Sequence, residues 1–164
     1  MARYTPPLRD IQFVMHELLD VESALKTLPP YAETNRELID QVVEEGGKFC
    51  AEVLFPLNRT GDEEGCRWSE GGAVTTPKGF KQAWEQFKAG GWPTLTCDPE
   101  YGGQGLPVAV GIAFQEMMNS ANQAWASVAN RISARAAVWR ALAAARAPLE
   151  GPGGRVHRKP SPAS

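Results

Sequence analysis

The stretch Pro99-Glu100-Tyr101-Gly102-Gly103-Gln104-Gly105-Leu106-Pro107 joins a glycine-rich turn to an apolar segment. Glycine at three of four successive positions allows a positive φ and a close approach of neighbouring backbone. Pro107 suits the first turn of a helix, where its missing N–H leaves no hydrogen bond unmade. The segment that follows, Val108 to Asn122, is apolar nearly all round, as expected of a helix enclosed on most sides. The stretch therefore predicts a tight turn that leads into a central helix.

Two helices are predicted at the start of the chain. Apolar residues recur at steps of three and four from Ile11 to Leu25, which predicts one helix that ends before Pro29-Pro30. A second helix is expected to begin near Glu33 or Thr34 and to have Pro56 near its end. The two prolines between these helices favour an antiparallel connection.

A third helix is predicted between a proline signal and a glycine signal. Thr76-Pro77 has the pattern of a helix start, and Gly90-Gly91 has the pattern of a helix stop. The preceding segment, Asn58 to Thr76, is polar, and we expect a loop with a short hairpin around Val74. With the central helix, these elements predict an all-α fold, an antiparallel helical bundle.

Charge divides the chain into two unlike parts. Residues 1–126 carry ten basic and eighteen acidic residues, whereas residues 127–164 carry seven basic residues and one acidic residue. The alanine content of Ile132 to Arg146 is compatible with a helix. Pro148 to Ser164 has no periodicity and is rich in proline, glycine and basic residues, so we expect a disordered basic C-terminal tail. Such a tail could attract polyanions, but its arginines form no stripe that would indicate a specific nucleic-acid site.

The cysteine spacing and the lengths of the apolar runs indicate in which cellular compartment the protein is expected. Three cysteines without C-x-x-C spacing indicate neither a disulfide framework nor a zinc site, which fits a reducing cytoplasm. The N-terminus has no signal-peptide core, and no run approaches the ~18 apolar residues that span a bilayer. We therefore expect a soluble, cytoplasmic protein.

Three patterns resemble reactive or ligand sites. His16-Glu17-Leu18-Leu19-Asp20 imitates the H-E-x-x-H zinc motif, but Asp20 replaces the second histidine, so solvated helix residues are predicted instead of a metal site. The glycine-rich turn lacks the spacing of a phosphate loop. Glu116 lies on the apolar helix and could act as an acid or base if it were buried, although no second carboxylate or histidine lies at helical spacing. We assign no catalytic, cofactor-binding or metal-binding residue.

Several ordered motifs together resemble one known family, the FAD-dependent acyl-CoA dehydrogenases, in the branch of the 3-methylmercaptopropionyl-CoA dehydrogenases. The resemblance runs from about Tyr4 to Ala126. It rests on Phe55-Pro56-Leu57-Asn58, Gly61-Asp62, Thr76-Pro77-Lys78-Gly79-Phe80, Gly90-Gly91-Trp92, Asp98 to Pro107 and Glu116 to Asn122.

The resemblance implies that residues 1–126 form an N-terminal helical domain, which a β-domain and a second helical domain follow in the family. Family members oxidise an acyl-CoA at Cα–Cβ in fatty acid metabolism, and FAD accepts the hydride. The family's catalytic base and flavin contacts lie in the later domains, so no FAD is expected on this chain alone. By position in the family, one wall of the acyl pocket would come from Met118, Ala121, Asn122 and Trp125.

The resemblance stops after Ala126, where the alanine- and arginine-rich segment 127–164 begins. Out-of-frame reading of G+C-rich coding DNA yields such a composition, so one hypothesis is a truncated enzyme with a frameshifted tail. A genuine short protein with a basic arm is the competing hypothesis. The alternative function is a small helical interaction module with a basic tail, and its exposed apolar faces would dock on a partner or self-associate.

Overall fold

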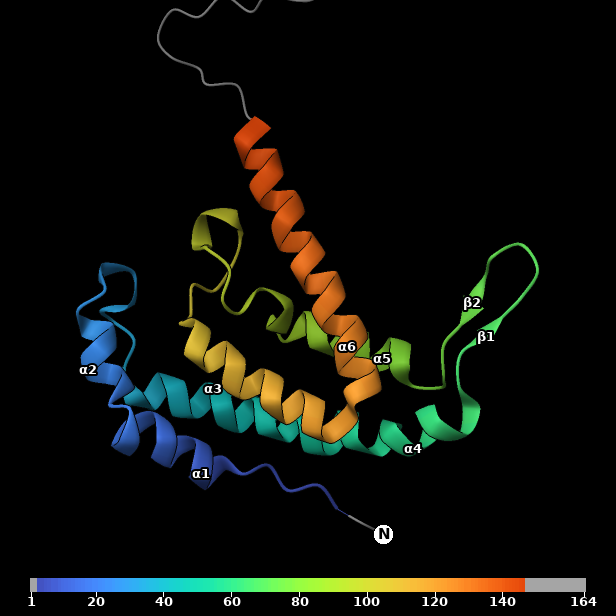
Figure 1. Ribbon diagram of the computed structural model, residues 1–164, viewed down its shortest axis with the longest axis horizontal. Helices are drawn as coiled ribbons and strands as arrows, with labels where there is room; N and C mark the ends of the chain where they lie inside the picture. Colours follow the sequence, from blue (N-terminus) through green and yellow to red (C-terminus); the bar gives the residue numbers. More distant parts are fainter. Residues whose placement is uncertain (1–2, 147–164) are drawn as a thin grey trace, which may run out of the picture.

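The computed structural model describes the backbone of residues 3–146 and the side chains through Arg131. Helices dominate these residues, and one two-stranded hairpin accompanies them. Figure 1 shows α1, the α3–α4 rod, α5 and the first half of α6 running in alternating directions, which confirms the all-α antiparallel bundle. The elements are α1 (Leu8–Gln12), η1 (Phe13–Leu18), α2 (Val21–Lys26), η2 (Pro29–Tyr31), α3 (Arg36–Phe49), η3 (Cys50–Leu54), α4 (Phe55–Glu64), β1 (Arg67–Trp68), β2 (Val74–Thr75), α5 (Phe80–Ala89), η4 (Trp92–Thr94), η5 (Pro99–Tyr101) and α6 (Val108–Arg146).

The first predicted helix is not continuous, so that prediction was wrong. α1 passes into the π-helical turn η1, where the Leu19 N–H donates to the Val14 carbonyl oxygen (3.0 Å). Asp20 then takes a left-handed conformation with φ 43°, and α2 begins after it. Aspartate tolerates this conformation better than most residues. The break at Asp20 separates α2 from η1, and Leu18, within the predicted apolar periodicity from Ile11 to Leu25, is exposed.

The second predicted helix continues past Pro56, where we expected it to end. It begins at Arg36, and the side chain of Asn35 accepts the Leu38 N–H (2.9 Å) as its N-cap. The π-helical turn η3 separates α3 from α4, which places Pro56 in the first turn of α4. A proline in a first turn has no N–H to leave unpaired. Residues 36–64 therefore form one nearly unbroken rod, and the predicted loop begins only after Glu64.

The structure confirms the predicted hairpin around Val74 and the predicted helix stop at Gly90-Gly91. β1 and β2 pair antiparallel with Trp68 opposite Val74. α5 ends at Ala89, and Gly91 takes a positive φ of 74° just beyond it. The start was predicted too early, because α5 begins at Phe80 with Gly79, not Thr76, at its N-cap.

The glycine-rich turn folds back on residues 94–98 and is as tight as predicted. Gly102 and Gly105 have positive φ angles, and a Cβ on Gly103 would overlap the carbonyl group of Cys97. The backbone N–H groups of residues 103–106 all donate to carbonyl oxygens of residues 94–98 at 2.9–3.0 Å. These bonds use the N–H groups of the turn itself within the fold, so the turn has a structural role.

α6 consists of two helices that meet at Asn122, whose φ of −158° and ψ of 87° are non-helical. The first half is the predicted central helix, and Val110, Met117 and Ala121 on it are fully buried. The prediction that it is enclosed on most sides was wrong, because Val108 is 60% and Ile112 58% exposed. The second half leaves at a sharp angle and extends to Arg146, so the helix with which the alanine content of 132–146 was compatible is present (Figure 1). Ala129, beyond the predicted domain boundary, is also buried. The disorder predicted for 148–164 lies outside the described residues.

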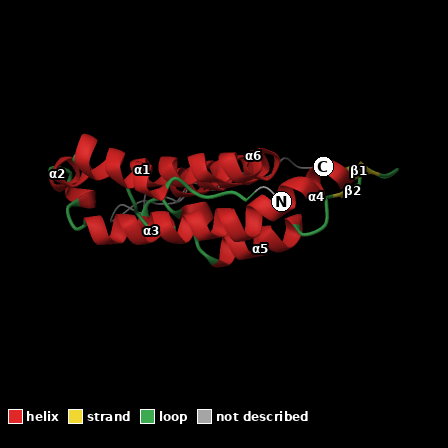
Figure 2. Cartoon of the chain, turned by 90° about the horizontal axis from the view of Figure 1, so that it is seen from below, coloured by secondary structure: helices red, strands yellow, loops and turns green. Residues whose placement is uncertain are grey.

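Aromatic rings join the helices into one core. The rings of Trp92 and Phe114 stack at 4.4 Å, and Phe87 meets Trp125 edge-on at 5.3 Å. Viewed from below, α1 and α6 lie in one layer, and α3 and α5 lie in the other (Figure 2). The core therefore sits between the layers and ties both halves of α6 to α3 and α5. Its rings are Phe49, Trp84, Phe87, Trp92, Phe114 and Trp125.

Candidate functional site

The four residues predicted to line an acyl pocket cluster at the break of α6. Met118 and Ala121 end its first half, Asn122 is the break itself, and Trp125 lies in the first turn of the second half. All four side chains are buried. The structure therefore brings them together, on the inner side of the domain, where they contact the core.

Asn122 uses both ends of its side-chain amide. Its Nδ2 donates to the carbonyl oxygen of Leu54 (3.2 Å), and its Oδ1 accepts the Trp125 N–H (3.0 Å). The second bond is that of an N-cap, so Asn122 starts the second half of α6. The first bond fixes the break against the junction of η3 and α4. Because the donor and the acceptor of this buried amide are both hydrogen-bonded, they fix the break in α6 at Asn122.

Trp125 borders an apolar cavity of about 310 Å³ between α4, α5 and the second half of α6. Its Nε1 donates to the carbonyl oxygen of Phe80 (3.3 Å), which fixes the orientation of the ring. Cys66 and Lys81 also line this cavity. Met118 borders a different, smaller cavity of about 180 Å³ beside Trp92. Trp125 and Met118 thus border different cavities, and the lining of neither cavity includes Ala121 or Asn122.

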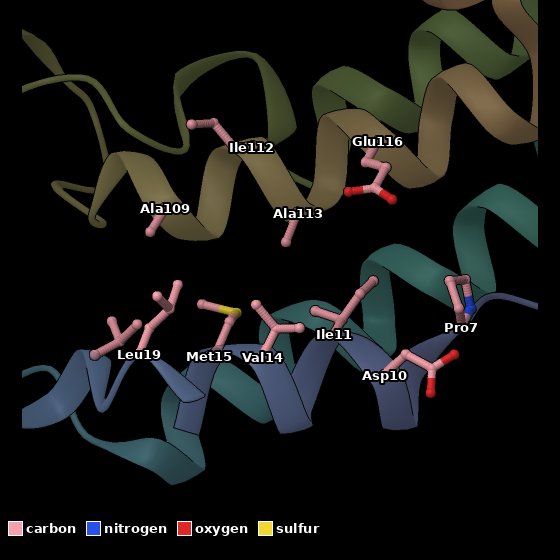
Figure 3. A pocket seen from close by; sticks show the side chains of 11 residues that line it. Pro7, Asp10, Ile11, Val14, Met15, Leu19, Ala109, Ile112, Ala113 and Glu116 are labelled. Carbon is pink, nitrogen blue, oxygen red and sulfur yellow. The ribbon is translucent and has the colours of Figure 1, made fainter. Parts of the chain in front are cut away.

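A third hollow, which we call the α1/α6 groove, has a volume of about 460 Å³. Figure 3 shows the long side chains of Met15 and Leu19 on one wall and the short side chains of Ala109 and Ala113 on the facing wall. The small residues on α6 leave the space. Glu116 lies at one end of the groove and is exposed, so it is not the buried carboxylate that acid or base chemistry on an apolar helix would need.

His16 is buried, so its prediction as a solvated helix residue was wrong. Its Nδ1 lies 2.6 Å from Glu22 Oε1, its Nε2 lies 2.9 Å from Asp40 Oδ1, and its side chain is only 1% exposed. Arg36 Nε lies 3.7 Å from the other oxygen of Asp40. The sequence carries little signal for this cluster, because Glu22 comes within reach only through the break at Asp20 and Asp40 belongs to another helix.

Two side chains have raised pKa values because they are buried. Burial raises the pKa of the Cys50 thiol to about 12, which keeps it protonated and unreactive at neutral pH. Burial also raises the pKa of Tyr4, whose hydroxyl donates to the Met117 carbonyl oxygen (3.3 Å). Both groups lie inside the packing around α6, and neither is poised for acid or base chemistry.

The residues through Arg131 hold no group of three or more histidine, cysteine or acidic side chains placed to bind a metal ion. Within the described part of the chain, every helix is too short or too polar to cross a bilayer.

Comparison with known proteins gives two informative matches, although no family model matches the chain. It is 40% identical over 122 residues to a 3-methylmercaptopropionyl-CoA dehydrogenase of Ruegeria pomeroyi, which covers 74% of this chain and 20% of that protein. It is 34% identical over 83 residues to a butyryl-CoA dehydrogenase of Syntrophomonas wolfei, which covers 49% of this chain and 14% of that protein. The chain therefore spans a fifth or less of these curated relatives. Both relatives show that this chain is related to the acyl-CoA dehydrogenase family.

Proposed function

We propose that this chain acts as the N-terminal helical domain of an FAD-dependent acyl-CoA dehydrogenase and forms one wall of its acyl pocket. The observation that carries the proposal is the 40% identity over 122 residues to a named dehydrogenase. The all-α fold supports it, because a helical domain at this end is what the family resemblance implies. The wall would be formed around the break in α6 by Met118, Ala121, Asn122 and Trp125.

The described residues would contribute shape and apolar surface rather than chemistry. Removal of hydrogen from Cα and Cβ needs a positioned base and an electron acceptor, here FAD. The glycine-rich turn already uses its N–H groups on residues 94–98, so it does not offer them to a flavin phosphate. We therefore assign the base and the flavin contacts to the other four-fifths of the enzyme.

The proposal is tested by a chimera. Residues 1–126 replace the matching segment of the Ruegeria pomeroyi relative, and the purified chimera is assayed for bound FAD and for dye reduction driven by 3-methylmercaptopropionyl-CoA. We expect a flavin-loaded, active chimera, and we expect the 164-residue chain alone to be colourless and inactive. A control chimera carries an unrelated four-helix bundle in the same place and should be inactive. A folded chimera that binds FAD but turns over no acyl-CoA contradicts the proposal.

Mutation at Trp125 tests the pocket wall within that chimera. Trp125→Phe keeps an aromatic ring in the core but removes the indole N–H that fixes it on Phe80. We expect KM or the preference for acyl length to change while the FAD content stays constant. Trp68→Phe, on the exposed hairpin, is the matched control and should change neither.

The second candidate function is a small helical interaction module. The observation in its favour is the apolar α1/α6 groove, around which Val14, Leu19 and Ile112 are exposed. Exposed apolar surface of this kind promotes association between proteins. The chimera separates the two candidates, because an interaction module would not restore dehydrogenase activity.

A further inference from the structure

The buried cluster around His16 links three consecutive elements of the fold. His16 belongs to η1, Glu22 to α2 and Asp40 to α3, and the ring nitrogens lie 2.6 Å and 2.9 Å from the two carboxylates. We propose that His16 is a protonation-dependent latch that ties α2 to α3 and thereby holds the α2 end of the α1/α6 groove. This inference is independent of the proposed function.

The hydrogen-bonding capacity of the groups carries the argument. An ionised carboxylate only accepts hydrogen bonds, and an imidazole donates from both nitrogens only when it carries two protons. A ring with one proton can therefore keep only one of the two bonds. The unprotonated nitrogen then points its lone pair at a carboxylate oxygen, and both atoms are acceptors. With the His16 side chain 1% exposed, water has little access to replace the lost bond.

Loss of either bond loosens the same segment. If the bond to Glu22 fails, α2 is no longer tied to η1, and if the bond to Asp40 fails, η1 is no longer tied to α3. The α3 side is additionally held, because Asp40 also pairs with Arg36 on its own helix at 3.7 Å. α2 has six residues, which is too short for a helix to persist without tertiary contacts.

The latch acts on the groove through the residues beside it. Met15 directly precedes His16, Val21 directly precedes Glu22, and both line the groove, as does Leu19. The left-handed turn at Asp20 lies between the two bonded residues. When the latch opens, the wall formed by Leu19 and Val21 is free to move away from Ala109 and Ala113.

The experiment uses the two histidines of the chain, His16 and His157. Imidazole ¹⁵N shifts of the full chain report the protonation of each ring as the pH is raised, and His157→Gln assigns the signals. Amide exchange of α2, corrected for the intrinsic effect of pH, is followed in the same samples. We expect protection of α2 to fall about tenfold as His16 loses its second proton, with α3 unchanged. Unchanged α2 protection through that step, or a folded-state His16 that never carries two protons, overturns the proposal.

Variants provide a second, independent readout. Glu22→Gln places a side-chain amide opposite His16 Nδ1, and this amide can accept from a protonated nitrogen or donate to an unprotonated one. We expect α2 protection in this variant to lose its dependence on the protonation of His16. Glu17→Gln, an exposed neighbour of His16, is the matched control and should keep the wild-type pH dependence. A Glu22→Gln protein with wild-type α2 protection and pH dependence also contradicts the latch.

Discussion

The two sides of this bundle are stabilised by different kinds of contact. On the aromatic side, α3, α5 and both halves of α6 share a cluster of stacked and edge-on rings. On the α1–α2 side, short helical pieces are joined by a buried polar cluster and face a groove of about 460 Å³. The aromatic side buries apolar surface through many contacts, whereas the α1–α2 side depends on a few directional bonds. The aromatic side therefore sets the stability of the domain, and the α1–α2 side is its adjustable part.

The comparison is tested most strongly by truncating a ring on the aromatic side. Phe114 is buried and contacts Phe49, Phe87 and Trp92. We expect Phe114→Ala to lower the free energy of unfolding by about 3–5 kcal/mol, as measured by urea denaturation. Phe13→Ala removes a ring that is 52% exposed on the α1–α2 side and should cost less than about 0.5 kcal/mol. Equal losses for the two variants would contradict the contrast.

The turn that joins α5 to α6 gives the next largest effect. Gly103→Ala places a Cβ against the carbonyl group of Cys97, so the backbone must move, and we expect a loss of about 3 kcal/mol or failure to fold. Gly102→Ala meets no atom within 4 Å and only strains a φ of 77°, so a loss of about 1–2 kcal/mol is expected. Thermal melts of both variants measure the difference. A milder effect at Gly103 than at Gly102 would show that the turn is looser than described.

Asn122 tests whether the break in α6 belongs to the rigid side. Asn122→Ala removes the N-cap of the second half of α6 and the bond to the Leu54 carbonyl oxygen. We expect a loss of about 1–3 kcal/mol, because the cap is lost and a buried carbonyl loses a partner. Gln123→Ala, exposed at the next position, is the control and should be nearly neutral. A neutral Asn122→Ala would mean that the break is held by the rings alone.

The smallest effect on stability, with the clearest effect on association, is expected at the groove. Ile112 is 58% exposed and borders both the α1/α6 groove and the cavity beside Trp92. We expect the wild-type chain to self-associate as concentration rises and Ile112→Glu to remain monomeric with little change in stability. Val74→Glu, on the hairpin, should not prevent association. Sedimentation velocity that shows a wild-type monomer at every concentration would contradict this prediction.

Local signals predicted the elements that depend on neighbouring residues. The stop at Gly90-Gly91 and the hairpin around Val74 both follow from residue types whose preferences act within a turn. The tight turn around Gly103 was likewise predicted. Family resemblance added the group of residues around the break of α6, although its role in an acyl pocket stays a prediction.

Non-local contacts explain what the sequence did not predict. The apolar periodicity from Ile11 to Leu25 fits one helix. The left-handed conformation of Asp20 breaks that helix, and it depends on how α2 packs against the rest of the fold. A proline usually ends a helix. Before Pro56, however, the π-helical turn η3 changes the backbone hydrogen-bonding pattern, so that Pro56 falls in the first turn of α4. The burial of His16 depends on Asp40, which lies 24 residues away and has no sequence pattern that connects the two.

The amide of Asn122 also has a mechanical consequence. Residues 123–146 form an arm of about 36 Å, given a rise of 1.5 Å per residue, and Asn122 at its base is bonded to Leu54. A rotation of about 10° at Asn122 would move the far end of the arm by about 6 Å. A small change of geometry at the base of the arm would therefore be magnified at its far end.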